Sequence, residues 1–245
     1  MPVGMLRTAE RPWEFPVLTP GSLQAVVFDF DGTLAELTID FGAMKRELLA
    51  LVQVVIPTAR LVPGIPALEW MEIILSPLLR EAPEEALALR ARFDRRIMDI
   101  EIAAARKGEL FPFVRPMLHR LRGDGLKLAV ITRNCTQAVR EVFPDIAEYT
   151  DCVFARGDVS RVKPDPGHLH VALQHMDVEA CRAIMVGDHV LDIATGKGAG
   201  TWTAGVLTGV CTRQNFVDAG ADIVADDGAG AVWAFLELHK FGRLI

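Results

Sequence analysis

The sequence has few of the features that mark a secreted, zinc-binding or membrane protein. Its four cysteines are widely spaced, with no CxxC pair and no His/Cys cluster at zinc spacing. No apolar run approaches the roughly 18 residues that a membrane-spanning helix needs. We therefore expect reduced thiols in a cytoplasmic protein that does not bind a membrane.

An excess of positive charge is also missing. Lys and Arg number 26 against 32 Asp and Glu, and the formal net charge is −6. Such a balance gives no electrostatic footprint for nucleic acid, so we expect no nucleic-acid partner. The first 20 residues contain four prolines and lack the apolar core of a signal peptide. We expect residues 1–20 to form an N-terminal arm.

What the sequence does contain is apolar residues, at 51% of 245 positions, arranged in a regular order. Short β-rich runs alternate with helical patterns, and continuous apolar strands between helices are typical of a parallel sheet covered on both faces. The sequence therefore predicts an α/β fold with a Rossmann-like parallel sheet. The predicted strands are 25–30, 127–132, 152–155, 183–188, 201–206 and 221–225, and the predicted helices are 115–122, 136–143, 166–176, 192–199 and 229–240.

One interval breaks this alternation. The first two strands are separated by far more chain than the roughly 30 residues of a βαβ unit. The intervening stretches have apolar residues at helical spacing, as in Met44, Leu48, Leu51, Val52 and Val55. We therefore predict an all-α insert at 36–109, with 21–35 and 110–245 forming the α/β core.

Two acids close together end the first predicted strand, in the run "AVVFDFDGTL" (25–34). On an extended strand Asp29 and Asp31 would share a face and repel each other unless a positive charge lay between them. Thr132, Asp188 and the loop of Lys163 follow other strands, and ligands collect at the carboxyl ends of parallel strands. Asp-Gly is also a common turn dipeptide, so this stretch alone does not distinguish a functional pair of acids from ordinary turn residues. Carboxylates gathered at such an edge would suit Mg²⁺.

Four motifs occur in a fixed order along the chain: "DFDGT" (29–33), "VIT" (130–132), Lys163-Pro164 and "GDHVLD" (187–192). Together they resemble the signature of the haloacid dehalogenase superfamily. The resemblance covers nearly the whole predicted core, and the insert is similar to the helical C1 cap of phosphoglycolate phosphatases and β-phosphoglucomutases. It implies a core in which the strands of Asp29, Thr132 and Asp188 lie side by side. It also implies an Mg²⁺-dependent phosphatase acting on a small-molecule phosphomonoester.

The resemblance further implies covalent catalysis. Asp29 would attack phosphorus and become an aspartyl-phosphate. Asp31 would protonate the leaving oxygen and then activate the water that hydrolyses the intermediate. Lys163 would neutralise charge on the phosphoryl group and on Asp29. Dehalogenases of the superfamily have no second acid at this place and no metal, so Asp31 favours phosphoryl transfer over carbon–halogen cleavage.

The implied metal ligands are Asp29, Asp31 through its backbone carbonyl, and Asp188. Asp192 would support the metal or orient Lys163.

The implied phosphate contacts follow the second motif. Thr132 would donate a hydrogen bond to the phosphoryl group. Many C1-capped relatives have Asn or Gly directly after this residue, whereas here Arg133 follows and Asn134 comes one position later. The second phosphate donor therefore stays open between Arg133 and Asn134.

Two other functions remain open on the sequence alone. A phosphomutase would use the same aspartyl-phosphate but would let a bound sugar bisphosphate reorient, and a non-catalytic sensor would only hold a phosphoryl group. Phosphoglycolate, sugar phosphates and nucleotides are all possible substrates, and the chain could be a monomer or a dimer. Of the histidines near Lys163, His168 and His170 are interpreted as surface or packing residues.

Overall fold

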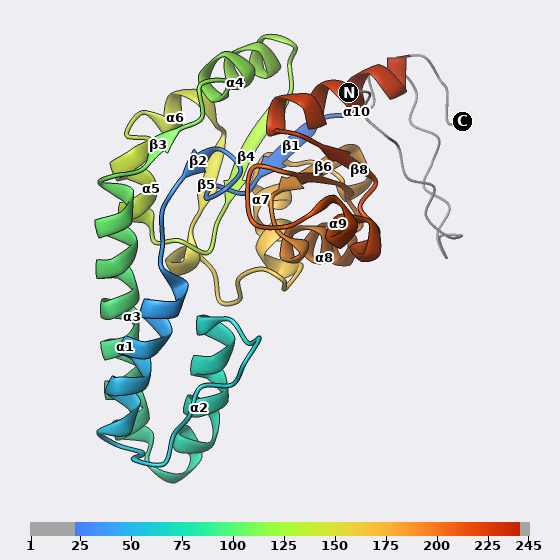
Figure 1. The fold of residues 1–245 in the computed structure, drawn as a ribbon. Helices are drawn as coiled ribbons and strands as arrows, with labels where there is room; N and C mark the ends of the chain where they lie inside the picture. Colours follow the sequence, from blue (N-terminus) through green and yellow to red (C-terminus); the bar gives the residue numbers. More distant parts are fainter. Residues whose placement is uncertain (1–22, 241–245) are drawn as a thin grey trace. The chain divides into compact units, whose positions relative to one another are not determined.

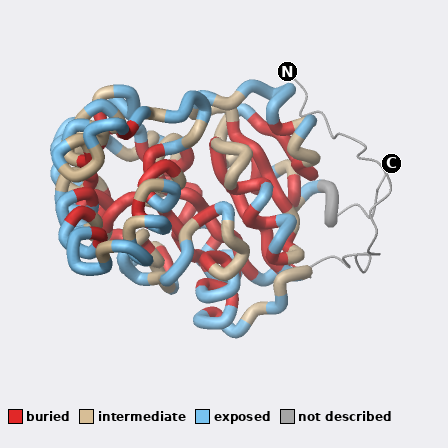
Figure 2. The backbone as a smooth tube through the Cα atoms, turned by 90° about the horizontal axis from the view of Figure 1, so that it is seen from below, coloured by how far each residue is buried: buried red, intermediate tan, exposed pale blue. Residues whose placement is uncertain are grey.

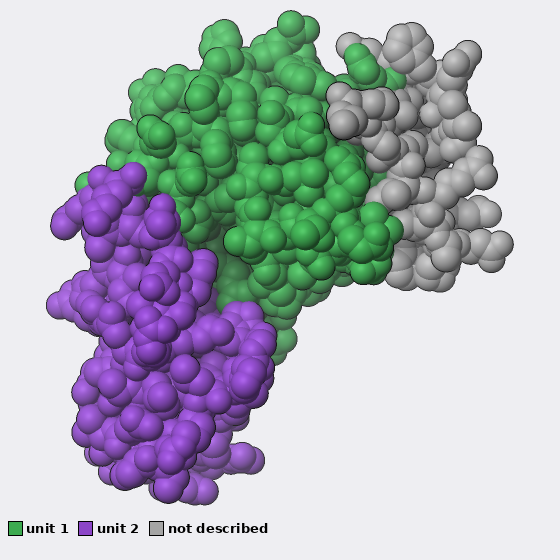
Figure 3. All heavy atoms as spheres, viewed as in Figure 1, with its two compact units in different colours: residues 1–37, 108–245 green, residues 38–107 purple. Residues whose placement is uncertain are grey.

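The structure, a computed structural model, describes residues 23–240 (Figure 1). The predicted N-terminal arm at 1–20 lies outside the described residues. The chain divides into two compact units, of residues 1–37 with 108–245 and of residues 38–107, coloured green and purple in Figure 3. Each unit is described by itself below.

The first unit is built on a six-stranded sheet whose paired strands all run parallel. The strand order is β5-β4-β1-β6-β7-β8, so the chain starts in the middle and builds outward in both directions. This arrangement confirms the predicted α/β fold, including the adjacent positions of the strands that precede Asp29, Thr132 and Asp188. The strands are β1 (Ala25–Phe28), β4 (Lys127–Ile131), β5 (Cys152–Phe154), β6 (Ala183–Gly187), β7 (Trp202–Val206) and β8 (Ile223–Ala225).

Helices cover both faces of this sheet, as the continuous apolar strands require. On one face α7 (Gly167–Met176) contacts β4 and β5, and α8 (Val190–Ala199) contacts β6 and β7. On the other, α4 (Val114–Gly123) contacts β4, and α10 (Gly228–Lys240) contacts β6, β7 and β8 (Figure 1). The strands accordingly form the buried centre of the unit (Figure 2). Shorter helices complete it: α5 (Thr136–Val142), α6 (Ile146–Tyr149) and α9 (Arg213–Ala219).

Alternate side chains of the central strands point to opposite faces, which is why both faces need cover. Ala25 and Val27 of β1, with Ala129 and Ile131 of β4, pack with α7 residues such as Leu173 in one core cluster. The side chains between them, such as that of Val26, are equally buried. The sheet is therefore held by two apolar layers rather than one.

A small second sheet pairs the segment that leaves the first unit before residue 38 with the segment that returns to it after residue 107. Its strands are β2 (Ala35–Glu36) and β3 (Glu109–Leu110), which pair antiparallel. Ala35 lies opposite Leu110, and Glu36 lies opposite Glu109.

The second unit contains three helices, α1 (Phe41–Gln53), α2 (Ala67–Glu81) and α3 (Pro83–Ala105). The apolar spacing that predicted α1 extends to Val55, but the helix ends at Gln53, before the turn that leads to Pro57. The three helices share one apolar core, in which Trp70 contacts Phe93. Its largest buried members are Leu48, Trp70, Met71, Leu75, Leu89 and Phe93.

Within the described part of the chain, no helix combines the length and the apolar character needed to cross a membrane.

Candidate active site

The carboxyl ends of three adjacent strands bring together side chains from distant parts of the sequence. Asp29 follows β1, Thr132 follows β4 and Asp188 follows β6, in the strand order β4-β1-β6. The backbone continues the sheet pairing by one residue at two of these ends. The Asp29 N–H donates to the Val186 carbonyl at 2.9 Å, and the Thr132 N–H donates to the Phe154 carbonyl at 3.0 Å. The three side chains therefore start from one edge of the sheet, where ligands of such folds bind.

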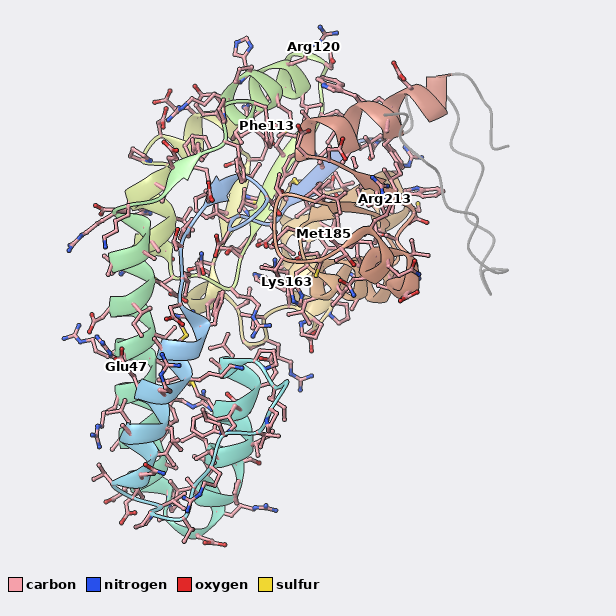
Figure 4. The ribbon with its side chains drawn as sticks, in the orientation of Figure 1. Glu47, Phe113, Arg120, Lys163, Met185 and Arg213 are labelled. Carbon is pink, nitrogen blue, oxygen red and sulfur yellow. The ribbon has the colours of Figure 1, made fainter. Side chains whose placement is uncertain are left out.

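A buried lysine lies between two of the predicted acids. Lys163, on the loop from β5 to α7 (Figure 4), places its Nζ 2.6 Å from Asp29 Oδ1 and 2.6 Å from Asp192 Oδ1. Lys163 is 2% exposed and Asp192 is 1% exposed. Burial lowers the pKa of Lys163, but Asp192 and Asp29 raise it by more, so the net shift is upward. The lysine is therefore a charged group held between two carboxylates.

The second carboxylate oxygen of Asp192 is held by a backbone N–H at the start of α8. Its Oδ2 accepts from the His189 N–H at 3.0 Å, and the His189 Nδ1 accepts from the Leu191 N–H at 3.1 Å. This reciprocal arrangement satisfies two N–H groups at the first turn of α8. The Asp192 carboxylate is thereby oriented toward Lys163 rather than toward solvent.

Asp29, Asp188 and Asp192 form a compact acidic group. Each offers one carboxylate oxygen, and the three oxygens lie within 4.8 Å of one another. Burial, with the nearby charges of Asp29 and Asp192, raises the pKa of Asp188 to about 9. Burial also raises the pKa of Asp192 to about 6, although Lys163 opposes that shift.

This acidic group fits a hard divalent cation. The three buried carboxyl groups outnumber the single ammonium of Lys163, and the raised pKa of Asp188 indicates that its ionised form lacks the nearby positive charge that a cation would supply. Carboxylate oxygens are the ligands that Mg²⁺ prefers, usually one or two from the protein together with waters and phosphate oxygens.

Two glycines and two threonines form the immediate surroundings of Asp188. Gly32 has a positive φ of 80°, and a Cβ there would lie 2.3 Å from Asp188 Oδ2. A Cβ on Gly209 would lie 1.8 Å from the same oxygen. Thr33 donates its hydroxyl to Asp188 Oδ1 at 3.3 Å, and Thr208 donates to the Gly32 carbonyl. The backbone approaches this carboxylate so closely that only glycine fits on either side.

Asp31 is not a member of the compact acidic group, although its charge helps to raise the pKa of Asp188. The predicted strand through residue 30 ends at Phe28, so Asp29 and Asp31 are not same-face neighbours on a strand. The Asp31 carboxylate is half-buried and accepts from the Leu37 N–H at 3.0 Å. The structure therefore groups Asp29, Asp188 and Asp192 by their side chains, while a ligand role for the Asp31 backbone carbonyl stays a prediction.

The loop after β4 contains the three residues predicted to contact phosphate. The Thr132 Oγ1 accepts from the Asn134 N–H at 3.1 Å, which gives the loop a tight turn. The Arg133 carbonyl accepts from the Arg156 guanidinium at 2.6 Å. Asn134 is buried, and its Nδ2 is without a hydrogen-bond partner among the described residues. A buried amide in this state has donor capacity to offer a ligand.

Thr33, Gly209 and His168 contact the site although no role at the site was predicted for them. Thr33 stands inside the "DFDGT" motif, which was the available signal for it. Gly209 is one of 20 glycines, and nothing local distinguishes it. His168 is a packing residue, as predicted, but its imidazole also accepts from the Lys163 N–H at 3.3 Å.

Comparisons with known proteins agree with this geometry. A protein-family model described as haloacid dehalogenase-like hydrolase matches residues 23–200. The chain is 29% identical over 211 residues to a plasmid-encoded phosphoglycolate phosphatase of Cupriavidus necator, covering 82% of this chain and 88% of the relative. It is 27% identical to an N-acetylmuramic acid 6-phosphate phosphatase of Pseudomonas putida, covering 83% of this chain and 92% of the relative.

Solved structures show the same fold. CbbY from Rhodobacter sphaeroides, crystallised in complex with phosphate, superposes with a TM-score of 0.58 at 23% identity, covering 84% of this chain and 95% of that one. A structure described as a putative beta-phosphoglucomutase from Thermotoga maritima gives a TM-score of 0.56 at 20% identity, covering 88% of this chain and all of that one.

Proposed function

The chain belongs to the haloacid dehalogenase-like hydrolase family, and from that premise we propose that it is a Mg²⁺-dependent phosphatase that hydrolyses a small-molecule phosphomonoester through an aspartyl-phosphate on Asp29. The observation that carries the proposal is the placement of Asp29. Its buried carboxylate follows the central strand, lies 2.6 Å from the Lys163 ammonium and belongs to the acidic group with Asp188. A nucleophile and its charge partners are thus held in place before any substrate binds.

The first half of the proposed reaction transfers the phosphoryl group to the protein. An oxygen of Asp29 attacks phosphorus, and the bond between phosphorus and the ester oxygen breaks. Asp31 gives its proton to the departing oxygen, which leaves as an alcohol. Lys163, already in contact with the attacking carboxylate, stabilises the negative charge that spreads over the phosphoryl oxygens.

The second half returns the protein to its starting state. Asp31, now a carboxylate, takes a proton from a water molecule that attacks the aspartyl-phosphate. Inorganic phosphate leaves, and the carboxylate of Asp29 is restored. Thr132 and the unpaired amide of Asn134, on the loop after β4, are the proposed donors to the phosphoryl oxygens.

Asp29 and Asp188, with the backbone carbonyl of Asp31, would hold Mg²⁺ in this proposal, and Asp192 would orient Lys163. When bound, the ion supplies positive charge to the attacking carboxylate and to the phosphoryl group.

Phosphoglycolate is the first substrate to test, because a phosphoglycolate phosphatase is among the relatives that align over most of this chain. We assign the choice of leaving group to the helical unit of residues 38–107, as the proposed C1 cap.

The proposal is tested by assaying the purified protein against phosphoglycolate, sugar phosphates, nucleotides and p-nitrophenyl phosphate. Each ester is offered with Mg²⁺ and with a chelator in its place, and released phosphate is measured. We expect Mg²⁺-dependent hydrolysis of at least one member. Conversion of glucose 1-phosphate to glucose 6-phosphate without phosphate release would instead show a mutase. Phosphate binding with no turnover of any ester would show a sensor.

The nucleophile is tested by Asp29→Asn. Because the amide cannot form the aspartyl-phosphate, we expect kcat to fall by about 10³-fold or more, with the fold retained. Asp177→Asn is the matched control, since Asp177 is exposed and has a φ of 52° that asparagine also adopts. Appreciable turnover by the Asp29 variant would exclude this residue as the nucleophile.

A further inference from the structure

His168 is a fully buried histidine next to the lysine loop. It is the second residue of α7, and both nitrogens of its ring are engaged. Its Nδ1 lies 3.3 Å from the backbone nitrogen of Lys163, and its Nε2 lies 2.9 Å from the Phe154 carbonyl oxygen.

The partners of this ring fix its tautomer. The Lys163 backbone nitrogen can only donate, so Nδ1 must accept, and the ring proton therefore sits on Nε2 and donates to the Phe154 carbonyl. A second proton on Nδ1 would face the Lys163 N–H. Burial lowers the pKa of His168 to about 4, in agreement with a neutral ring. The histidine is thus a fixed connector with one acceptor and one donor.

This connector joins two elements of the proposed site. The Phe154 carbonyl at the end of β5 also accepts from the Thr132 N–H at 3.0 Å. One imidazole therefore links the backbone of Lys163 to the carbonyl that holds the backbone of Thr132. Lys163 lies on the loop between β5 and α7 and Thr132 directly follows β4, and both are proposed to contact the phosphoryl group.

Neither a role in capping α7 nor the need to fill space explains why residue 168 is a histidine. The start of α7 is satisfied by Asp165, whose Oδ1 accepts from the Gly167 N–H at 2.8 Å and whose carbonyl accepts from the His168 N–H at 3.2 Å. An apolar side chain could fill the same space, but it would leave the N–H of Lys163 without this acceptor in a buried position. The feature that only a polar ring supplies is the pair of bonds to Lys163 and Phe154.

We infer that His168 is a positioning residue for phosphoryl transfer, because it sets the backbone of Lys163 relative to that of Thr132. This inference rests on the proposed function. Lys163 reaches Asp29 through a long side chain, so a displaced backbone changes the approach of the ammonium to the reacting group. Such an interaction acts on the charge of the transition state, and its loss lowers kcat more than it changes KM.

Three substitutions separate the two hydrogen bonds. In His168→Asn the side-chain oxygen falls near the position of Nδ1 and can still accept from Lys163, while the bond to Phe154 is lost. In His168→Gln the amide nitrogen falls near the position of Nε2 and can still donate to Phe154, while the bond to Lys163 is lost. His168→Leu removes both. His170→Asn is the control, because His170 is exposed on the same helix.

Steady-state kinetics on the best ester of the panel give the readout, with thermal unfolding measured for every variant. We expect kcat of the leucine variant to fall about tenfold, as the loss of its bond to the Lys163 N–H predicts, with KM within about twofold of wild type. The asparagine variant should recover most of kcat, because it keeps the acceptor for the Lys163 N–H and the Phe154 carbonyl still accepts from the Thr132 N–H. The glutamine variant should recover less. If the leucine variant does not fold, the kcat values of the asparagine and glutamine variants still show whether the bond to the Lys163 N–H controls turnover.

The inference is overturned by a folded leucine variant with wild-type kcat. It is equally overturned if the losses in kcat follow the losses in melting temperature without the asparagine variant standing out, since that result describes a residue needed only for stability. Wild-type protein that hydrolyses no ester overturns the proposed function itself, so the two failures are distinguishable.

Discussion

Lys163 shows how single side chains constrain one another at this site. A lysine that is 2% exposed keeps its charge because Asp29 and Asp192 each lie 2.6 Å from its Nζ. The two carboxylates depend on the lysine in turn, since both belong to the acidic group that includes Asp188. Removing the lysine therefore leaves the two carboxylates as buried charges without compensation.

We expect Lys163→Met to impair both stability and activity. Breaking a buried ion pair from one side typically costs about 3–5 kcal/mol of unfolding free energy, and the proposed transition state loses its cation. Urea unfolding measures the first effect and kcat the second, with exposed Lys107→Met as the control. An active enzyme of unchanged stability would contradict the assigned role of the lysine.

His168 should also make stability depend on pH. Its pKa is about 4 in the folded protein against about 6.5 in an unfolded chain, so between these values the unfolded state binds more protons. The free energy of unfolding should therefore fall as pH drops from about 6.5 toward 4, by up to roughly 3 kcal/mol. Lys163 lowers this pKa, whereas Asp29 and Asp158 oppose the shift.

The measurement is urea unfolding of wild type and His168→Asn between pH 4 and pH 7. The raised pKa values of Asp188 and Asp192 act in the opposite sense, since a carboxyl that binds a proton more tightly in the folded state favours folding at low pH. The difference between the two proteins isolates the histidine. A variant with the same pH slope as wild type would refute this origin of the slope.

At the scale of elements, the strands of the sheet were predictable because buried parallel strands are continuous apolar runs. Their ends were less so. The strand predicted through residue 30 stops at Phe28, since Phe30 is buried in the turn that follows rather than in the sheet. The two-residue strands β2 and β3 are too short to show any period, and α9 was not among the predicted helices.

The predicted site residues could be identified from the sequence because they follow predicted strands in ordered motifs. The residues that hold them in place could not, because those residues reach the site only through tertiary contacts. Gly209 and His168 reach the site from a loop and a helix that the sequence places far from Asp188 and Thr132. No local sequence pattern shows which loop will approach the Asp188 carboxylate. Nor does one show that the His168 ring and the Thr132 N–H will bind the same carbonyl.

The loop after β7 gives a prediction of its own. We expect Gly209→Ala to lower activity by more than about tenfold, because its Cβ would lie 1.8 Å from Asp188 Oδ2 and the carboxylate or the loop must move. Gly123→Ala is the matched control. A Cβ there meets nothing within 4 Å, and alanine in α4 should stabilise the protein by up to about 1 kcal/mol. Equal kinetics for the two variants would show that the close approach has no bearing on the reaction.

At the scale of the whole molecule, the excess acid at the site adds to a net charge of −6. Binding of Mg²⁺ to the folded state alone stabilises it by mass action, about 2.7 kcal/mol at one hundred times the dissociation constant. We therefore expect Mg²⁺ to raise the melting temperature of wild type, measured at matched ionic strength. Asp188→Asn should abolish this increase while being at least as stable as wild type without the ion, since it removes a carboxyl group whose ionised form is disfavoured by burial and by the charges of Asp29 and Asp192. An equal Mg²⁺ shift in both proteins would place the ion elsewhere.

The pairing of β2 with β3 has a consequence for how this chain can be rebuilt. Glu36 and Glu109 lie opposite each other in an antiparallel pair of strands, so the chain leaves the first unit and returns to it at adjacent positions. If residues 38–107 were deleted, Leu37 and Gly108 could serve as the two-residue tip of an ordinary hairpin. We therefore expect the helical insert to be removable, and other inserts to be accepted at the same junction without re-routing the backbone around the proposed catalytic carboxylates.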